Sequence, residues 1–164
     1  MKRLIGLFLL VLLFFSACGG DEEIRFYYPK AEFDYRAESG IMESEVREAP
    51  GHEDDLNYLM ALYFEGPVGP ALTSPFPRGT AMLEYSLSGN TLEMTMNESF
   101  AALDDLEHTI ASACIAQTCF GLKDAEHIVI KYNSDRYGSK TITLSRDSLV
   151  MTDNAVDPSQ TIEP

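Results

Sequence analysis

The stretch AMLEYSLSGNTLEMTMN, residues 81–97, sets the architecture of this chain. Apolar residues alternate with more polar ones on both sides of the segment Ser88-Gly89-Asn90. Period-two alternation around a short turn of Gly and Asn predicts a β-hairpin. The rest of the domain is therefore placed around this strand pair.

A helix is predicted on each side of the hairpin. The earlier helix follows an acidic cluster, which the positive end of the helix dipole favours, and it ends at Gly66-Pro67. One face of it carries Leu56, Leu59, Met60, Tyr63 and Phe64. In the later helix, Ser99 could be the N-cap and Gly121 suits the C-terminal end. The expected apolar stripe of that helix is Leu103, Leu106, Ile110, Ala113 and Cys114.

Further strands are predicted at residues 24–28, at 128–132 and at 141–144. Residues 33–48 could be another extended segment or a loop. The element order is then β-α-β-β-α-β-β, which implies an α+β fold with two helices packed on one face of a mixed β-sheet. We expect a single domain over residues 24–152 with its core in 50–145, followed by an acidic disordered tail over 153–164.

The N-terminus has the pattern of an export signal. Lys2 and Arg3 precede an apolar run at residues 4–15 that is too short to cross a hydrocarbon core of about 30 Å. The next segment, Phe15-Ser16-Ala17-Cys18, resembles the lipobox of bacterial lipoproteins. We therefore predict a lipoprotein signal peptide at 1–17, a palmitate-type lipid anchor on Cys18 and a polar tether at 18–23. The alternatives are an ordinary signal peptide in which Cys18 is incidental and an uncleaved membrane anchor.

The charge balance limits the partners. The chain has 12 basic and 26 acidic residues, and two of the basic ones lie in the signal, so the mature net charge is near −16. Nucleic acid is excluded, because its phosphates require Lys and Arg. The expected partners are the membrane, through the lipid on Cys18, and another envelope protein. The expected location is the outer face of the cell membrane.

No catalytic residue, cofactor or metal site is predicted. Cys114 and Cys119 lie about 140° apart on a helix, which does not suit a disulfide, so both are interpreted as small buried hydrophobes. Asp104 and His108, at i and i+4, could form a pair of metal ligands. The favoured interpretation of that pair is a solvated helix face.

A proline-rich loop at residues 66–79 is the best candidate for partner binding. Prolines limit the backbone entropy that is lost on recognition, and aromatic and Arg side chains are enriched at interfaces. The candidate partner-binding residues are Pro75, Phe76, Pro77 and Arg78. The alternative is that Pro75 and Pro77 only brace the entrance to the hairpin.

Four segments in order resemble a GerMN domain, the module named for sporulation and spore-germination proteins. They are the helix end LYFEGP (62–67), the loop LTSPFPRGT (72–80), the hairpin closing on MNE (96–98), and the helix segment IAQTC (115–119) with the strand 125–132 after it. The motifs cover about half of the chain. The family often has an apolar residue in place of Cys119, and some members carry two tandem copies where this chain has one.

The resemblance implies a lipid-anchored or exported binding module of spore-forming Gram-positive bacteria, similar to the ring-building motifs of channels between mother cell and forespore. The predicted function is a non-catalytic protein-interaction or scaffold module in the cell envelope, with a role in sporulation or germination. Two alternatives are an enzyme acting on cell-wall glycan or peptide and a small-ligand-binding lipoprotein.

Overall fold

The computed structural model describes residues 23–32, 40–134 and 138–149. The predicted signal peptide, Cys18, the tether before Glu23 and the acidic tail lie outside these residues. Among the described residues, no helix has the length and apolar character needed to cross a membrane.

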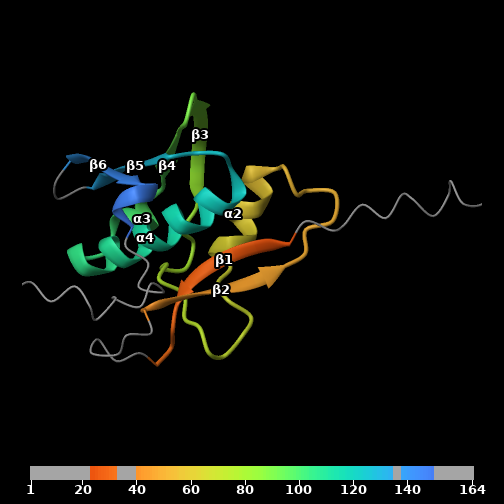
Figure 1. Ribbon diagram of the computed structural model, residues 1–164. Coiled ribbons are helices and arrows are strands. Elements are labelled where there is room, and N and C mark those ends of the chain that lie inside the picture. The colour runs from red at the N-terminus through yellow and green to blue at the C-terminus, as the bar shows by residue number, and fades with distance from the viewer. Residues whose placement is uncertain (1–22, 33–39, 135–137, 150–164) are drawn as a thin grey trace, which may run out of the picture.

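A four-stranded mixed sheet forms the centre of the fold (Figure 1). Its strands are β3 (Met82–Ser88), β4 (Thr91–Met96), β5 (His127–Ser134) and β6 (Gly138–Ser145), in the order β3-β4-β5-β6. The two outer pairs are antiparallel, whereas β4 and β5 are parallel, so the chain between them must cross over. The predicted hairpin, β3 and β4, is confirmed.

The helix before the hairpin, α2 (Leu56–Phe64), also matches its prediction. The Asp55 side chain caps it by accepting hydrogen bonds from the backbone N–H groups of Asn57 and Tyr58. Four of the five residues on the predicted face are buried: Leu56, Leu59, Met60 and Tyr63. Gly66, whose φ of 95° favours glycine, follows the C-cap residue Glu65.

The later helix is divided in two, α3 (Glu98–Ala101) and α4 (Asp105–Leu122), and the prediction of Ser99 as its N-cap is wrong. Asn97 caps α3, and Asp104 caps α4 in a capping box with Glu107. A carboxylate that accepts from the N3 amide starts a new helix, which sequence periodicity does not register.

A separate two-stranded antiparallel sheet, β1 (Ile24–Pro29) with β2 (Met42–Arg47), lies across α4 from the mixed sheet (Figure 1). The backbone N–H of Tyr27 in β1 donates to Thr118 Oγ1 of α4 at 2.9 Å. The fold is α+β as predicted, but the first strand does not join the main sheet. Of the segment 33–48, residues 42–47 form a strand, and residues 33–39 lie outside the described residues.

Because α4 is covered on two sides, it lacks a single apolar stripe. Buried residues surround much of it: His108, Ala111, Ser112, Cys114, Ile115, Ala116, Thr118, Cys119 and Phe120. Leu106, predicted to be on the buried stripe, is 61% exposed in the first turn. The chain after β6 continues as a short 3₁₀ helix, η1 (Arg146–Ser148).

Two tyrosines connect α2 to the β1–β2 sheet. Tyr28 Oη donates to the carbonyl of Tyr63 at 2.8 Å, and Tyr63 Oη donates to the carbonyl of Tyr27 at 2.7 Å. Burial raises the pKa of the Tyr63 hydroxyl well above its ordinary value. With Phe26, whose ring centroid is 5.2 Å from that of Tyr63, these rings form the aromatic part of the core.

Candidate functional site

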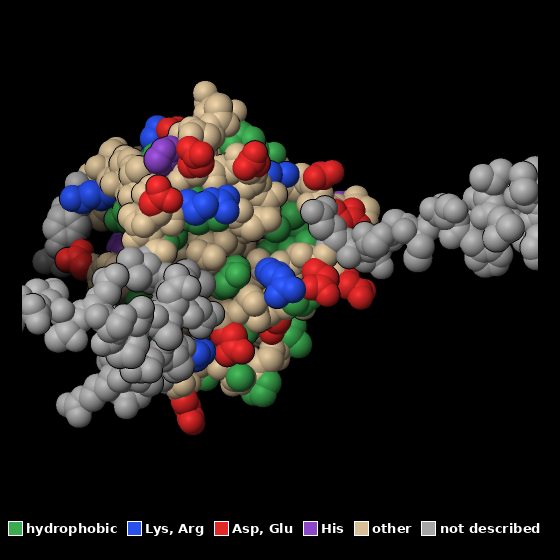
Figure 2. Space-filling view, in the orientation of Figure 1, with side chains coloured by type: hydrophobic (Ala, Val, Ile, Leu, Met, Phe, Trp, Pro, Cys, Tyr) green, Lys and Arg blue, Asp and Glu red, His purple; other side chains and the backbone are tan. Residues whose placement is uncertain are grey.

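The outer strand of the mixed sheet carries three exposed apolar side chains, Leu83, Tyr85 and Leu87, which we call the outer strand surface. They are 64%, 39% and 50% exposed. β3 is an edge of the sheet, and among the described residues no strand pairs with its far side. Figure 2 shows hydrophobic side chains at the surface beside the β3–β4 hairpin. Large apolar residues on an open edge are uncommon in isolated domains.

Two residues of the outer strand surface, Tyr85 and Leu87, lie on the same side of the sheet as the core, whereas Leu83 lies at an irregularity in the pairing between Met82 and Glu84. Tyr85 is opposite Met94 and Leu87 is opposite Leu92, and directly opposed residues in an antiparallel pair share a face. Leu92 and Met94 are fully buried. The core side of β4 is therefore covered, whereas that of β3 is only partly covered.

The backbone of β3 also faces outward at these positions. Ser88 and Thr91 close a two-residue turn, so they form a hydrogen-bonded pair, and pairing alternates from there along the strands. Ser86 and Glu84 then bond to β4. It follows that the N–H and C=O groups of Leu87 and Tyr85 point away from the sheet.

The opposite face of the hairpin is polar and acidic. Glu84 Oε1 accepts from Thr95 Oγ1 at 3.2 Å, and Glu93 pairs with Lys131 at 2.6 Å. Lys131 therefore neutralises Glu93, while the hydrogen-bond partner of Glu84 within the described part of the chain is a hydroxyl.

One residue of the predicted partner-binding loop, Phe76, belongs to the hydrophobic core. Phe76 is 8% exposed, and its ring meets those of Tyr63 and Phe64 edge-on at centroid distances of 5.1 and 5.0 Å. This packing fits the bracing alternative for Phe76, whose ring is not available as a surface contact. Pro75 and Pro77 are half-buried and Arg78 is exposed. Partner binding by the loop stays a prediction, and Arg78 is its accessible group.

Sequence reasoning missed a polar network that holds the start of this loop. Glu45 Oε2 accepts from the backbone N–H groups of Val68 at 2.9 Å and Gly69 at 2.8 Å. Arg47 donates to Glu45 at 2.8 Å, to the carbonyl of Leu62 at 3.1 Å and to the carbonyl of Gly66. Burial raises the pKa of Glu45, but these backbone hydrogen bonds and Arg47 outweigh it and lower the pKa overall. The only sequence signal was a Glu-x-Arg pair in a segment that left two interpretations open.

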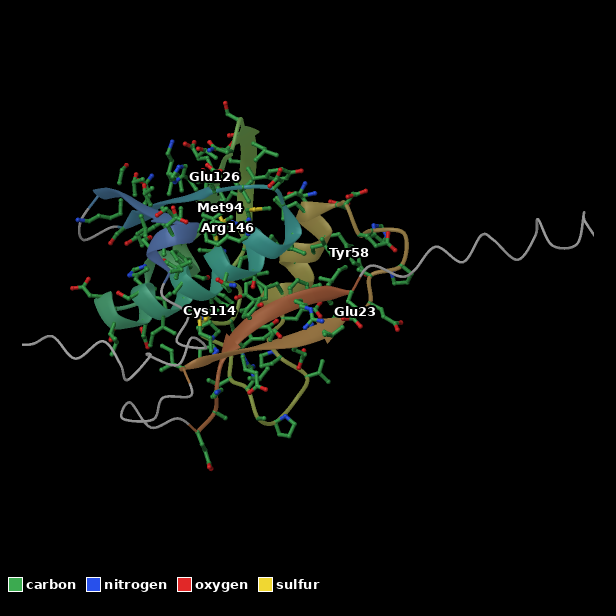
Figure 3. The ribbon with its side chains drawn as sticks, viewed as in Figure 1. Glu23, Tyr58, Met94, Cys114, Glu126 and Arg146 are labelled. Atoms are coloured by element: carbon green, nitrogen blue, oxygen red, sulfur yellow. The ribbon has the colours of Figure 1, made fainter. Side chains whose placement is uncertain are left out.

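Both predicted structural cysteines are buried. Cys114 Sγ lies 3.2 Å from Met42 Sδ, and Figure 3 shows it beside the β1–β2 sheet. Cys119 Sγ lies 3.9 Å from Met60 Sδ. Burial raises the pKa of both thiols to about 12, so neither is a thiolate at neutral pH.

The prediction of a solvated helix face around Asp104 and His108 is wrong for His108. Its ring is 8% exposed, stacks on Tyr132 at a centroid distance of 4.6 Å and meets Phe100 edge-on at 5.2 Å. Asp104 is exposed and accepts from the backbone N–H of Glu107 at 2.8 Å. The carboxylate therefore caps α4 and does not pair with the imidazole.

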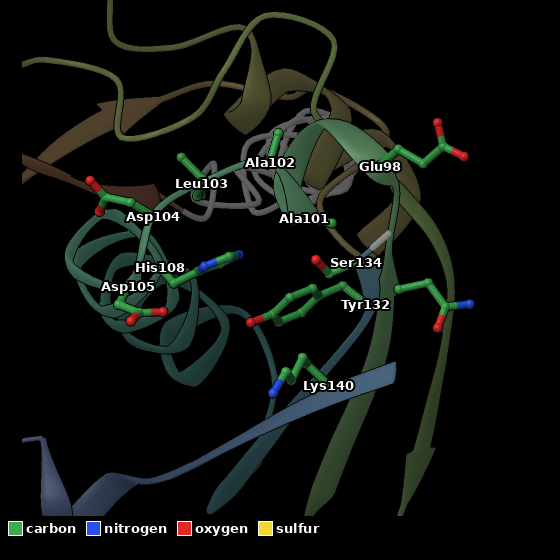
Figure 4. Close-up of a pocket in the computed structure, with 11 residues that line it drawn as sticks. Glu98, Ala101, Ala102, Leu103, Asp104, Asp105, His108, Tyr132, Ser134 and Lys140 are labelled. Atoms are coloured by element: carbon green, nitrogen blue, oxygen red, sulfur yellow. The ribbon is translucent and has the colours of Figure 1, made fainter. Parts of the chain in front are cut away.

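His108 lines a hollow of about 640 Å³ at the start of α4 (Figure 4). Its other polar walls are Glu98, Asp104, Asp105, Asn133, Ser134 and Lys140. The His108 Nε2 atom is buried without a hydrogen-bond partner among the described residues. Burial, with a smaller effect of Asp105, raises the pKa of Tyr132. No three His, Cys, Asp or Glu side chains within the described ranges gather as metal ligands.

The features above define a small α+β domain with one open, apolar sheet edge. Its fold is that of a GerMN domain: the structure is similar to the tandem GerMN domains of the sporulation protein GerM from Bacillus subtilis, with a TM-score of 0.51 and 12% identity. The match covers 74% of this chain and 44% of that chain, so the chain spans less than half the length of the tandem protein. At this identity the likeness shows the fold alone, and at that level it confirms the predicted resemblance.

A second similar structure is a Clostridium perfringens protein provisionally described as a lipoprotein, with a TM-score of 0.46 and 14% identity. That match covers 78% of this chain and 89% of the other. No family model and no curated protein matches the sequence.

Proposed function

We propose that this protein is a lipid-anchored envelope lipoprotein whose GerMN-like domain docks, without catalysing a reaction, on another protein at the outer face of the membrane. The observation that carries the proposal is the outer strand surface, where three large apolar side chains lie along an unpaired sheet edge. Exposed apolar edges of this kind mark interaction sites.

The proposed anchor would hold the start of the domain close to the membrane. The first strand begins at Ile24, six residues after Cys18. Six residues span at most about 20 Å when fully extended. A partner would therefore be another membrane protein or a protein at the inner surface of the wall. The likeness to a sporulation protein supports a role in sporulation or germination, in a Gram-positive cell.

The small-ligand alternative is favoured by one specific observation, the hollow beside His108. Its volume of about 640 Å³ lies within the range of small-molecule sites. The described residues around it include no nucleophile paired with a base, so the hollow supports binding better than turnover.

Anchoring is tested by growing cells with alkyne-labelled palmitate and comparing the wild-type chain with Cys18→Ser. We expect label on the wild type alone, and processing only of the wild type. An unlabelled mature protein, or one that keeps its leader, would remove the membrane location from the proposal.

Docking is tested by photo-crosslinking in intact membranes, with a crosslinking residue at Leu83 or, as the control, at Leu106. Both side chains are more than 60% exposed, but Leu106 lies in the first turn of α4. We expect one envelope protein to be joined at Leu83 in a fixed ratio and nothing comparable at Leu106. Equal, scattered products from both sites would contradict docking at the outer strand surface.

A further inference from the structure

We infer that the outer edge of β3 receives an extended segment of a partner protein as a fifth strand, with apolar residues on one face of that segment and Lys or Arg on the other. The inference rests on the proposed docking function and deepens it, because it specifies the binding mode and the chemistry of the partner.

The backbone of β3 supplies the hydrogen bonds for strand addition. The N–H and C=O groups of Tyr85 and Leu87 point outward, as the register from the Ser88–Thr91 turn requires. An added strand pairs with both residues without breaking any bond between β3 and β4. Recognition through a sheet edge takes its affinity from such main-chain bonds and its specificity from alternate side chains.

The side chains of β3 define one face of the partner. In an added strand, a residue opposite Tyr85 or Leu87 would have its Cβ about 4.5–5.5 Å away on the core side of the sheet. Both side chains are at least 39% exposed, so an apolar residue there removes apolar surface from water on both partners. This face of the segment is therefore apolar.

The polar face of β3 defines the other face of the partner. Glu84 is exposed there, with only the Thr95 hydroxyl as a hydrogen-bond partner among the described residues. The mature chain carries 26 acidic and ten basic residues, so its long-range field attracts a basic segment. A Lys or Arg opposite Glu84 forms a favourable cross-strand pair.

The strand at the other edge of the sheet, β6, has features that disfavour the addition of a strand. β6 carries Lys140 near its start, and its two large apolar residues, Ile142 and Leu144, are half-buried. An edge strand with Lys and without exposed apolar side chains is protected against pairing. β3 has no Lys, and the irregularity in its pairing with β4 lies between Met82 and Glu84, before the stretch that holds Tyr85 and Leu87. A second copy of this chain is the less suitable occupant, because two mature chains near −16 repel each other.

The test measures fluorescence anisotropy of a labelled nine-residue peptide of alternating Val and Lys. The full-length protein is used in phosphatidylcholine nanodiscs, and empty nanodiscs provide the background. We expect saturable binding of this peptide, and binding at least about tenfold weaker for the matched peptide of Val and Glu. Failure of the Val–Lys peptide to bind, or equal binding of both peptides, would overturn the inference.

Two substitutions at one position separate strand addition from side-chain contact. Leu87→Ser removes the apolar contact and is expected to weaken binding about fivefold. Leu87→Pro also removes the outward N–H while leaving the bonds to β4 in place, and is expected to weaken it about fivefold more. Leu106→Ser, at a similarly exposed leucine, is expected to leave binding unchanged. Equal losses for Ser and Pro would show docking without strand addition.

Amide hydrogen exchange of the wild-type protein tests strand addition without depending on whether a substituted protein folds. We expect the peptide to slow exchange at Tyr85 and Leu87, and unchanged rates there would overturn the inference. Concentration-dependent dimers in sedimentation, disrupted by Leu87→Pro, would also overturn it in favour of a second copy.

If the membrane crosslink from Leu83 persists in Leu87→Pro, strand addition is wrong and the docking function stands. If the wild type forms no crosslink while the peptide binds, the docking function fails instead.

Discussion

Two of the antiparallel strand pairs of this domain, β1–β2 and β3–β4, are similar in length and opposite in environment. In the β1–β2 pair, Phe26 and Tyr28 are fully buried against α4 and α2. In the β3–β4 pair, the alternate apolar residues of the outer strand, among them Leu87, are exposed. The alternation of apolar side chains is at least as regular in β3 as in β1.

The difference lies in what covers each free side. The outward N–H of Tyr27 is met by Thr118 of α4, whereas the outward groups of Tyr85 and Leu87 meet no described strand. A two-stranded pair is marginal by itself, so β1 and β2 depend on the helices for their stability. The β3–β4 pair gains its stability from β5 and can leave its edge open. Coverage, and not alternation, separates a buried strand from one with an open edge.

The largest expected effect is the contrast between Phe26→Ala and Leu87→Ala. Phe26 packs on Tyr63 and lies beneath the Arg47 guanidinium, 5.6 Å from its ring centroid. Its truncation should lower the free energy of unfolding by about 3–5 kcal/mol, whereas Leu87→Ala should change it by no more than about 0.5 kcal/mol. Urea denaturation measures both, and similar losses would show that β3 is covered.

A smaller effect is expected for Tyr63→Phe, compared with Tyr85→Phe. Removing the Tyr63 hydroxyl leaves the part-buried carbonyl of Tyr27 without its 2.7 Å donor, which should cost about 1 kcal/mol. The Tyr85 ring lies on the open surface, so its hydroxyl should contribute nothing measurable. Thermal denaturation of the two variants checks this, and an equal shift in both would contradict the assignment.

The hydrogen bonds of Glu45 should make the free energy of unfolding depend on pH. The folded-state pKa of Glu45 is lowered, so the stability it contributes is present above its ordinary value of 4.5 and is lost as pH falls through the lower, folded value. Glu45→Gln should cost about 1 kcal/mol at pH 7 and less as the pH falls below 4.5. Denaturation of wild type and variant at several pH values measures this, and a cost independent of pH would contradict the network.

The sequence predicted the hairpin, the extent of α2, the buried cysteines and the α+β class, because each has a local pattern. It could not predict that α4 would have strands on two sides, since burial all round removes the helical stripe. The cap at Asp104 has the Asp-x-x-Glu signal of a capping box, but Ser99 also fitted a cap. His108 was misplaced because the stacking of its ring on Tyr132, 24 residues later in the chain, has no sequence signal.

The smallest expected effect concerns His108, whose Nε2 atom is buried and has no hydrogen-bond partner among the described residues. His108→Phe keeps the stacking on Tyr132 and removes the unpaired Nε2 atom. Replacing an unsatisfied buried group by an apolar one of similar shape should be neutral or raise the free energy of unfolding by up to about 0.5 kcal/mol. A loss above about 1 kcal/mol in urea denaturation would show that Nε2 has a partner.

Residue-resolved amide hydrogen exchange of the isolated protein tests the openness of the β3 edge most directly. The amides of Tyr85 and Leu87 should exchange on the order of 100-fold faster than the amide of Tyr27, which donates to Thr118 at 2.9 Å. Equally slow exchange at Leu87 and Tyr27 would mean that the edge of β3 is already occupied, and it would contradict the docking role assigned to it.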